Sequence, residues 1–178
     1  MRVPDFICVG AQKAGTTWLY KQISRHPQVL LRTKELDFFF KIPTLDLNWY
    51  SAHFDEALTF QLCGDISPNY AAFVGRVRQI YYFCPDARII HLLRNPVERA
   101  FSQWKMAREP SNIPYQVTFL SAFSNNMQYM KRRGEYISII DEYDYFYPLG
   151  SKPAVFWYDD IVKKSRRPHA TYLRIFGD

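Results

Sequence analysis

The sequence predicts an α/β fold of three layers, in which helices cover both faces of a central parallel sheet of about four to five strands. Apolar runs of strand length recur along the chain, and segments with helical spacing lie between them. Strands that are apolar throughout are typical of parallel sheets, whose two faces are both buried. The 178 residues are 48% hydrophobic and show no repeat or linker, so we expect a single domain over 1–178.

The elements follow from local patterns. The apolar, β-favouring run 6–9 indicates a strand, and Trp18, Leu19 and Ile23 then follow at helical spacing. Strands are predicted at 5–10, 61–66, 87–93 and 153–158, with a short one at 29–31. Helical patterns lie at 15–25, 46–57, 73–83, 96–108, 115–131, 135–145 and 168–176. The segment 109–118 is expected to be an exposed connection between helices.

Composition excludes some classes of protein. No apolar stretch approaches the roughly 20 residues that span a bilayer, and the N-terminus lacks the apolar core of a signal peptide, so we expect a soluble, cytoplasmic protein without stable membrane insertion. The three cysteines have no metal-binding spacing and are expected to be buried free thiols. The net charge of +6 suits an anionic ligand but does not by itself identify one.

The segment 6–20, FICVGAQKAGTTWLY, resembles a phosphate-binding loop with a displaced lysine. Gly10 and Gly15 keep the spacing of a P-loop, and Thr17 keeps its hydroxyl position. Thr16 stands where the lysine belongs, and the lysine is found three residues earlier as Lys13. Backbone N–H groups at the helix start can still bind a phosphate. The pattern therefore predicts a P-loop-like nucleotide site and disfavours a magnesium-dependent nucleotide hydrolase.

A second strand, turn and helix occurs at 88–104, RIIHLLRNPVERAFSQW. Pro96 fits the first helical turn, Arg94 stands at the carboxyl end of the strand, and Ser102 lies two helical turns further on. A guanidinium and a hydroxyl converging from these positions would hold a second phosphate. The alternative is that Arg94 caps the sheet edge and Arg99 pairs with Glu98 or Glu35.

Together these motifs resemble those of sulfotransferases that use 3′-phosphoadenosine-5′-phosphosulfate (PAPS). The segment 13–19 resembles their 5′-phosphosulfate loop, and Arg94-Asn95-Pro96-x-x-Arg99-x-x-Ser102 resembles their 3′-phosphate motif. Further similarity lies at 25–27, 34–39, 64–70, 133–136 and 155–160, and is greatest to the glycan (heparan-sulfate-type) and bacterial branch. The resemblance implies PAPS as co-substrate and 3′-phosphoadenosine-5′-phosphate (PAP) as product. The implied nucleotide-binding residues are Lys13, Ala14, Gly15, Thr16, Thr17, Trp18, Arg94 and Ser102.

The resemblance also suggests why the lysine is displaced. Within the loop, Lys13 can meet the oxygen that bridges sulfur and the departing phosphate, where negative charge develops. Glu35, at the KE-x-x-FF position, is the expected general base; the alternative is a helix-starting residue paired with Lys34 or Arg32. Because the leaving group is a stable phosphate and no metal-ligand cluster is evident, transfer without a metal is predicted. Trp18 is expected either to stack on adenine or to lie in the core.

The acceptor side is less defined. The acceptor is expected to be a hydroxyl or amine, of a carbohydrate, and not a nucleic acid. Candidate contacts are Asp37, Ser67, Asn69 and Tyr136, although Ser67 and Asn69 also fit a simple turn and Tyr136 also fits the core. Asp37 and Ile66 replace a histidine and a lysine of some heparan-type enzymes. The alternatives are a non-catalytic PAP-, PAPS- or glycan-binding protein and a small P-loop kinase.

Family members continue beyond the position of residue 178 into a loop that carries glycine and lysine and closes over the 3′-phosphate. The resemblance therefore predicts a minimal or C-terminally shortened domain. The basic run 163–167 is interpreted as a solvated connection between helices.

Overall fold

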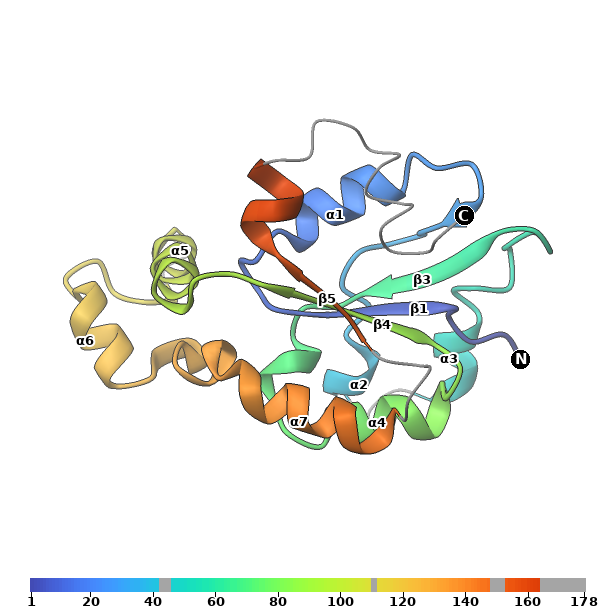
Figure 1. Ribbon diagram of the computed structural model, residues 1–178. Helices are drawn as coiled ribbons and strands as arrows, with labels where there is room; N and C mark the ends of the chain where they lie inside the picture. The colour runs from blue at the N-terminus through green and yellow to red at the C-terminus, as the bar shows by residue number, and fades with distance from the viewer. Residues whose placement is uncertain (42–45, 110–111, 148–152, 164–178) are drawn as a thin grey trace.

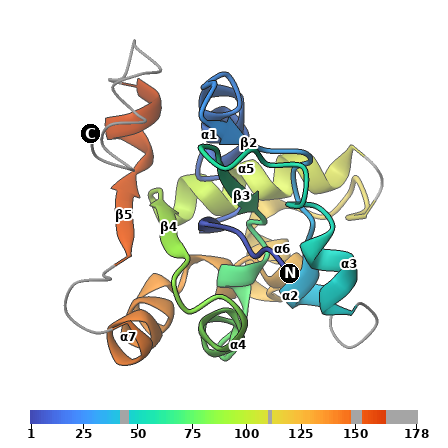
Figure 2. The ribbon, with the colours of Figure 1, turned by 90° about the vertical axis from the view of Figure 1, so that its right-hand side faces the viewer.

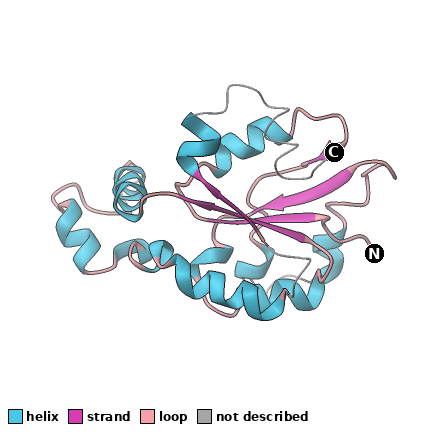
Figure 3. Cartoon of the chain, in the orientation of Figure 1, coloured by secondary structure: helices cyan, strands magenta, loops and turns pink. Residues whose placement is uncertain are grey.

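The computed structural model describes residues 1–41, 46–109, 112–147 and 153–163. They form an α/β fold around one sheet of five strands, as predicted (Figures 1 and 3). The strands are β1 (Phe6–Gly10), β2 (Val29–Leu30), β3 (Leu62–Ile66), β4 (Arg88–Leu93) and β5 (Ala154–Trp157). Their order is β2-β3-β1-β4-β5, and every neighbouring pair is parallel. Each of the five strands lies within a range that the sequence predicts as strand.

Helices cover both faces of the sheet (Figure 2). One face carries α1 (Thr16–Ile23) and the π-helical turn η4 (Asp159–Lys163). The other carries α2 (Phe38–Lys41), α3 (Leu47–Ser51), α4 (Arg76–Phe83) and α7 (Tyr136–Phe146). Side chains alternate along β1, so Phe6 and Cys8 join the core cluster on the α1 side, and Ile7 and Val9 join the cluster on the α4 side. Both clusters are apolar, which explains the uninterrupted apolar strands.

The remaining helices lie beyond the carboxyl ends of the strands (Figure 1). They are α5 (Pro96–Arg108), α6 (Phe119–Ser124) and the 3₁₀ turns η2 (Met127–Tyr129) and η3 (Arg132–Gly134); a further 3₁₀ turn, η1 (Tyr70–Ala72), follows β3. A third, smaller apolar cluster joins α5 to α6 through Ala100, Ala107 and Ala122. Of these helices, α5 lines the cavity described below, through Ser102 and Met106.

Several predicted helices differ from those observed. The predicted helix 115–131 is wrong, because α6 ends at Ser124 and the chain then takes a left-handed conformation at Asn126, Gln128 and Tyr129. The cause is tertiary: α5 side chains bind the backbone carbonyls of Gln128 and Met130. The pattern at 46–57 yields a helix only over 47–51. The short helix α2 was not predicted, and the predicted helix 168–176 lies outside the described residues.

The segment 109–118 connects α5 to α6, and most of its described residues are exposed, as predicted; Ile113 is the buried exception. Within its described part, Ile113 is 1% exposed and packs in the α5–α6 cluster. Its backbone N–H also donates to the carbonyl of Ala107, at 3.0 Å. The segment therefore forms part of the packing around α5.

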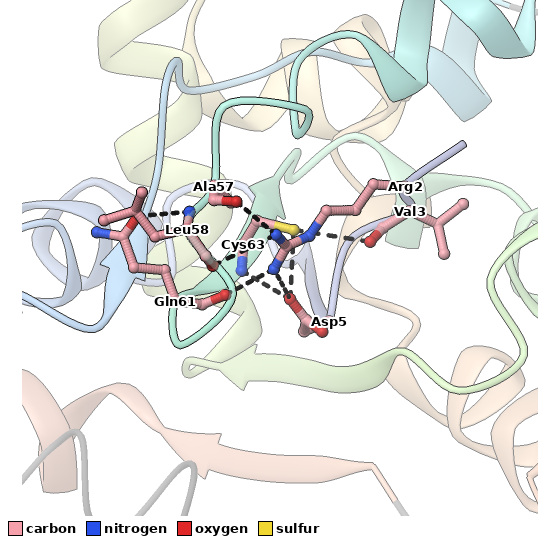
Figure 4. Close-up of polar contacts among 7 residues, drawn as sticks. All are labelled: Arg2, Val3, Asp5, Ala57, Leu58, Gln61 and Cys63. Carbon is pink, nitrogen blue, oxygen red and sulfur yellow. Dashed lines mark hydrogen bonds and ion pairs between the residues drawn. The ribbon is translucent and has the colours of Figure 1, made fainter.

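The N-terminal residues are held against the loop before β3 (Figure 4). Arg2 donates to the carbonyls of Ala57 (2.7 Å) and Gln61 (2.6 Å). Asp5 accepts from the backbone N–H of Cys63 at 2.8 Å. These bonds fix the start of β1, which leads directly into the glycine-containing loop.

Two sequence-based expectations can be compared with the described residues. Cys8, Cys63 and Cys84 are buried free thiols, as predicted. No helix in the described part of the chain has the length and apolar character needed to cross a membrane.

Candidate functional site

The loop between β1 and α1 presents the N-terminus of a helix. Gly15 occupies the N-cap position with φ 98°, a left-handed conformation that glycine adopts without steric cost, and no side chain caps the helix. The N–H of Leu19 donates to the carbonyl of Gly15 at 2.9 Å. The N–H groups of residues 16–18 precede this bond and therefore have no partner from a preceding helical turn. With the helix dipole, they favour an anion at this position.

The second motif lies beside this loop because β4 pairs with β1. Arg94, at the end of β4, donates to the carbonyl of Lys13 at 3.2 Å and to the carboxylate of Glu98 at 3.2 Å. Its guanidinium also lies 4.5 Å from the centre of the Tyr158 ring, at the end of β5. The loops after β1 and β4 meet where the connections leave the sheet in opposite directions, which is the usual ligand position in open parallel sheets.

Both motifs line a single cavity of about 370 Å³. Seven of the predicted site residues contribute to its wall: Lys13, Gly15, Thr16, Thr17, Glu35, Arg94 and Ser102. The remaining lining residues are Gln12, Lys34, Pro68, Met106 and Tyr158. The amino group of Lys13 lies 3.6 Å from the sulfur of Met106. Two segments about 80 residues apart in sequence thus contribute cations and hydroxyls to one cavity.

Two predicted nucleotide-binding residues, Ala14 and Trp18, are not among the residues that line this cavity. The methyl group of Ala14 is fully buried in the cluster beneath α1. Trp18 is partly buried against the same cluster and does not line the cavity. Trp18 thus packs against the core with part of its surface, and stacking on adenine stays a prediction.

Glu35 reaches the cavity from a segment held against the end of β3. Its backbone N–H donates to the carbonyl of Ile66 at 3.0 Å, and the N–H of Asp37 donates to Ser67 Oγ at 3.0 Å. The Glu35 side chain is 43% exposed and forms an ion pair with Lys34. The pairing considered as an alternative from the sequence is therefore present, and it occurs at the cavity wall.

Asp37, Asn69 and Arg133 form a polar network next to this segment. The amide of Asn69 donates to both carboxylate oxygens of Asp37, at 3.1 and 3.0 Å, and Arg133 donates to the Asn69 carbonyl oxygen at 2.8 Å. Burial raises the pKa of Asp37, and the bonds from Asn69 partly oppose this. Burial lowers the pKa of Arg133, whereas the nearby charges of Asp37 and Glu35 raise it. None of the three lines the cavity described above.

A buried carboxyl group lies beneath the network. Asp65 accepts hydrogen bonds from Ser67 Oγ (2.6 Å), Tyr70 OH (2.7 Å) and Tyr50 OH (3.0 Å). Burial raises the pKa of Asp65 to about 6, although the three hydroxyl donors lower it. Ser67 is fully buried between Asp65 and the Asp37 backbone, so the structure places it below the site rather than on the cavity wall.

Tyr136 and Arg99 also have supporting positions. The Tyr136 hydroxyl donates to the carbonyl of Arg94 at 2.8 Å, which holds the backbone at the second motif. Arg99 is fully buried and binds Gln103 and the carbonyl of Met130. The pairing of Arg99 with Glu98 or Glu35 considered from the sequence is wrong, because Arg94 pairs with Glu98 and Lys34 pairs with Glu35.

Sequence reasoning missed five of the residues that line the cavity. Gln12 and Lys34 adjoin Lys13 and Glu35, and Tyr158 ends a predicted strand, so their positions in the sequence could have indicated them. Pro68 lies between the predicted Ser67 and Asn69, and Met106 lies one helical turn after the predicted Ser102, so both also carried a signal of position. Within the described residues, no group of three or more His, Cys, Asp or Glu side chains is placed to hold a metal ion.

The fold and the cavity define a P-loop-like α/β protein with a candidate anion site where the loops after β1 and β4 meet. A model of the sulfotransferase family matches residues 51–149. The chain is 32% identical over 106 residues to the membrane-associated sulfotransferase kil1 of Dictyostelium discoideum, covering 57% of this chain and 22% of that protein. It is 29% identical over 155 residues to human heparan sulfate glucosamine 3-O-sulfotransferase 6, covering 83% of this chain and 45% of that protein.

Solved structures share the fold. A sulfotransferase from Alicyclobacillus acidocaldarius superposes with a TM-score of 0.81 at 24% identity, covering 92% of this chain and 76% of that one. Mouse sulfotransferase SULT7A1, complexed with PAP, gives a TM-score of 0.65 at 19% identity and covers 100% of this chain and 61% of that one. At these identities the similarity concerns the fold.

The chain belongs to the sulfotransferase family, because the family model matches more than half of it. The expected resemblance to PAPS-dependent sulfotransferases, a class of enzymes, is thereby confirmed. The chain spans less than half the length of the two curated relatives given above.

Proposed function

We propose that this protein transfers a sulfuryl group from PAPS to a hydroxyl or amine of a carbohydrate acceptor. The observation that carries the proposal is the convergence of Lys13, Arg94 and Ser102 with the open N-terminus of α1 and the carboxylate of Glu35 around one cavity. Family membership supports sulfuryl transfer, and the heparan sulfate sulfotransferases among its relatives support a glycan acceptor. Membership of the sulfotransferase family also argues against the alternative of a small P-loop kinase.

The residues present fit a nucleotide with a phosphate at each end. The N–H groups at the start of α1, with the hydroxyls of Thr16 and Thr17, would hold the 5′ end. Arg94 and Ser102 would hold the 3′-phosphate, as a guanidinium and a hydroxyl suited to an anion. A protein with the same fold has been solved in complex with PAP, which supports PAP as the nucleotide. When bound, PAPS supplies the activated sulfuryl group.

Lys13 would stabilise the charge that develops on the departing phosphate oxygen. Lys13, within the loop rather than after Gly15, lines the cavity together with Gly15 and Thr16, which supports this role. A preorganised cation at such a point is typically worth a factor of about 10² to 10³ in rate. Because Lys13 and Arg94 supply positive charge themselves, we propose that transfer requires no metal ion.

Glu35 would accept the proton of the attacking hydroxyl or amine. Its carboxylate is on the cavity wall and is partly exposed, so an acceptor can approach it from solvent. Lys34, its ion-pair partner, lies on the same wall and can hold the carboxylate in place. The sulfuryl group would then pass in line between the acceptor oxygen or nitrogen and the departing phosphate.

The first test is calorimetric titration of the purified protein with PAP in EDTA, beside ATP as competitor ligand. We expect metal-independent binding of PAP that exceeds binding of ATP and is lost in a Lys13→Ala/Arg94→Ala double variant. Turnover with PAPS and glycan acceptors would follow. Binding without turnover on any acceptor would instead identify a non-catalytic nucleotide-binding protein, and failure to bind PAP would contradict the site assignment.

A further inference from the structure

The segment that carries Glu35 is attached to the end of β3 through two of its backbone N–H groups. The N–H of Glu35 donates to the carbonyl of Ile66, and the N–H of Asp37 donates to Ser67 Oγ, each at 3.0 Å. The first acceptor is a backbone carbonyl, which every residue type supplies. The second acceptor is a side chain, so this attachment depends on the residue type at position 67.

The conformation of the segment requires such attachments. Glu35 and Asp37 have positive φ, 64° and 55°, on either side of the buried Leu36. Residues other than glycine keep this conformation only where their surroundings hold it. The direction in which the Glu35 side chain leaves the backbone therefore depends on the two hydrogen bonds to the end of β3.

Asp65 fixes the direction of the Ser67 hydroxyl group. A serine hydroxyl has one hydrogen to donate and two lone pairs that accept. Because Ser67 Oγ accepts from the Asp37 N–H, its hydrogen is free to donate to Asp65, at 2.6 Å. Burial raises the pKa of Asp65 to about 6, so the group is ionised and accepts at neutral pH. Tyr50 and Tyr70 donate to its other oxygen, at 3.0 and 2.7 Å.

Neither Asp65 nor Ser67 can act on a ligand directly. Both are 0% exposed. They line neither the cavity that Glu35 lines nor a second cavity, of about 340 Å³, whose wall includes Arg133. Any effect of these two residues on a reaction in the cavity must therefore pass through the residues that they hold.

We propose that Asp65 and Ser67 are positioning residues for sulfuryl transfer, which hold the backbone of Asp37 and thereby direct the Glu35 carboxylate into the cavity. The proposal deepens and rests on the proposed function, in which Glu35 is the base. A base must lie within hydrogen-bond reach of the proton that it accepts, so a small displacement of the segment lowers the rate. Nucleotide affinity should not depend on Ser67, because the anion loop is held by other contacts, such as the bond from Arg94 to the Lys13 carbonyl.

The first test follows the segment itself by amide hydrogen exchange, resolved by NMR. In Ser67→Ala the Asp37 amide should exchange at least about tenfold faster than in the parent, whereas amides of β1 and β4 should keep their protection. Ser67→Cys nearly keeps the volume of the side chain, but a thiol is a weak donor and acceptor, so it should also accelerate this exchange. Ser51→Ala is the matched control, at another buried serine that lines neither cavity.

The second test is turnover at neutral pH with PAPS and a hexasaccharide of alternating glucosamine and hexuronic acid, which offers both hydroxyls and amines. Ser67→Ala should lower kcat at least about tenfold and change KM for PAPS less than about twofold. In a Glu35→Gln background the same change should lower kcat less than about twofold, because the base is already absent. A merely structural role would lower kcat by the same factor in both backgrounds. Circular dichroism would confirm that each variant is folded.

The outcomes separate this proposal from the proposed function. Unchanged exchange of the Asp37 amide in Ser67→Ala, parent-like exchange in Ser67→Cys, or equal losses of kcat in the two backgrounds would overturn the proposal. Faster exchange with a loss of kcat only where Glu35 is present would support it. No turnover in the parent, with faster exchange in Ser67→Ala, would contradict the proposed function alone.

Discussion

At the scale of single residues, part of the backbone strain of the described chain lies at the site. Lys13, Glu35 and Asp37 all have positive φ, at 68°, 64° and 55°, although none is glycine. Each such residue costs about 1 to 3 kcal/mol and persists only where its surroundings hold it. For Glu35 and Asp37 those surroundings are the hydrogen bonds to Ile66 and Ser67 at the end of β3. We interpret the strain as the cost of presenting Lys13 and Glu35 to one cavity.

The proposed role of Glu35 predicts the behaviour of Glu35→Gln. Glutamine keeps the size of the side chain but cannot accept a proton, so kcat should fall by about 10² or more. Because the residue is on the cavity wall and not at the anion site, the affinity for PAP should change by less than about twofold. Initial rates with PAPS and calorimetric titration with PAP would measure the two effects.

Glu56→Gln is the matched control for this substitution. Glu56 is exposed and pairs with Arg32 at 3.0 Å, outside the cavity. A kcat for Glu35→Gln close to that of this control would contradict the assignment of Glu35 as the base.

At the scale of elements, the loop after β1 is shaped by close backbone contact with the chain after β3. Gly10 has φ 142°, and a Cβ atom there would lie 2.9 Å from the carbonyl oxygen of Pro68 and 3.1 Å from the Cβ of Ala71. The loop can pass this point only because glycine has no side chain. The same contact brings Pro68 to the cavity that Lys13 lines.

Gly10→Ala should therefore lower the free energy of unfolding more than Gly→Ala at another glycine with positive φ. The unfavourable φ costs about 1 to 3 kcal/mol, and the clash with backbone should bring the loss of unfolding free energy to about 2 to 4 kcal/mol. Gly75→Ala is the matched control, because Gly75 also has positive φ, 88°, but a Cβ there would have no atom within 4 Å. Urea unfolding would measure the free energy of unfolding of both variants. Equal losses would show that the close approach of Gly10 to Pro68 does not affect stability.

At the scale of the whole molecule, Asp65 joins the sheet, the helical layer and the site. Its backbone belongs to β3, its carboxylate accepts from Tyr50 of α3 and Tyr70 of η1, and its bond from Ser67 leads to the Asp37 backbone. The group is fully buried. Its ionisation should therefore affect the stability of the entire fold rather than that of one loop.

The raised pKa of Asp65, about 6 against an ordinary 3.8, predicts how stability depends on pH. Between these values the folded protein binds more protons at this group than the unfolded chain does, so the contribution to stability falls as pH rises from about 4 to about 6. One pKa unit is worth about 1.4 kcal/mol, which makes the loss about 3 kcal/mol. In Asp65→Asn this contribution is absent.

Urea unfolding of both proteins at intervals from pH 4 to pH 7 would test this. The parent should lose about 3 kcal/mol relative to Asp65→Asn over that range. Asp86→Asn, on an exposed residue, controls for the removal of one negative charge. A free-energy difference between parent and Asp65→Asn that stays constant with pH would contradict the prediction.

Sequence alone predicted most of the fold because the signals are local. Each strand is a short apolar run, and α5 agrees with its predicted bounds because Pro96 and the Asn95 cap mark its start. The failure at 115–131 has a long-range cause: Arg99 and Gln103 of α5 bind the carbonyls of Met130 and Gln128 and so hold this part of the chain against α5. No pattern within the segment itself carries that information.

The site also has features that follow from local sequence and features that depend on tertiary packing. The sequence by itself determined the anion loop with Lys13 and the Arg94–Ser102 motif, because each follows one strand and needs only its own turn and helix. Only the tertiary structure decided that these motifs share a cavity, that Glu35 reaches it from the end of β3, and that Arg133 lines a second cavity. Those facts depend on β1 lying between β3 and β4 and on α5 packing against the turns after α6. Contacts between segments far apart in sequence are set by the packing of the whole chain, and no local period records them.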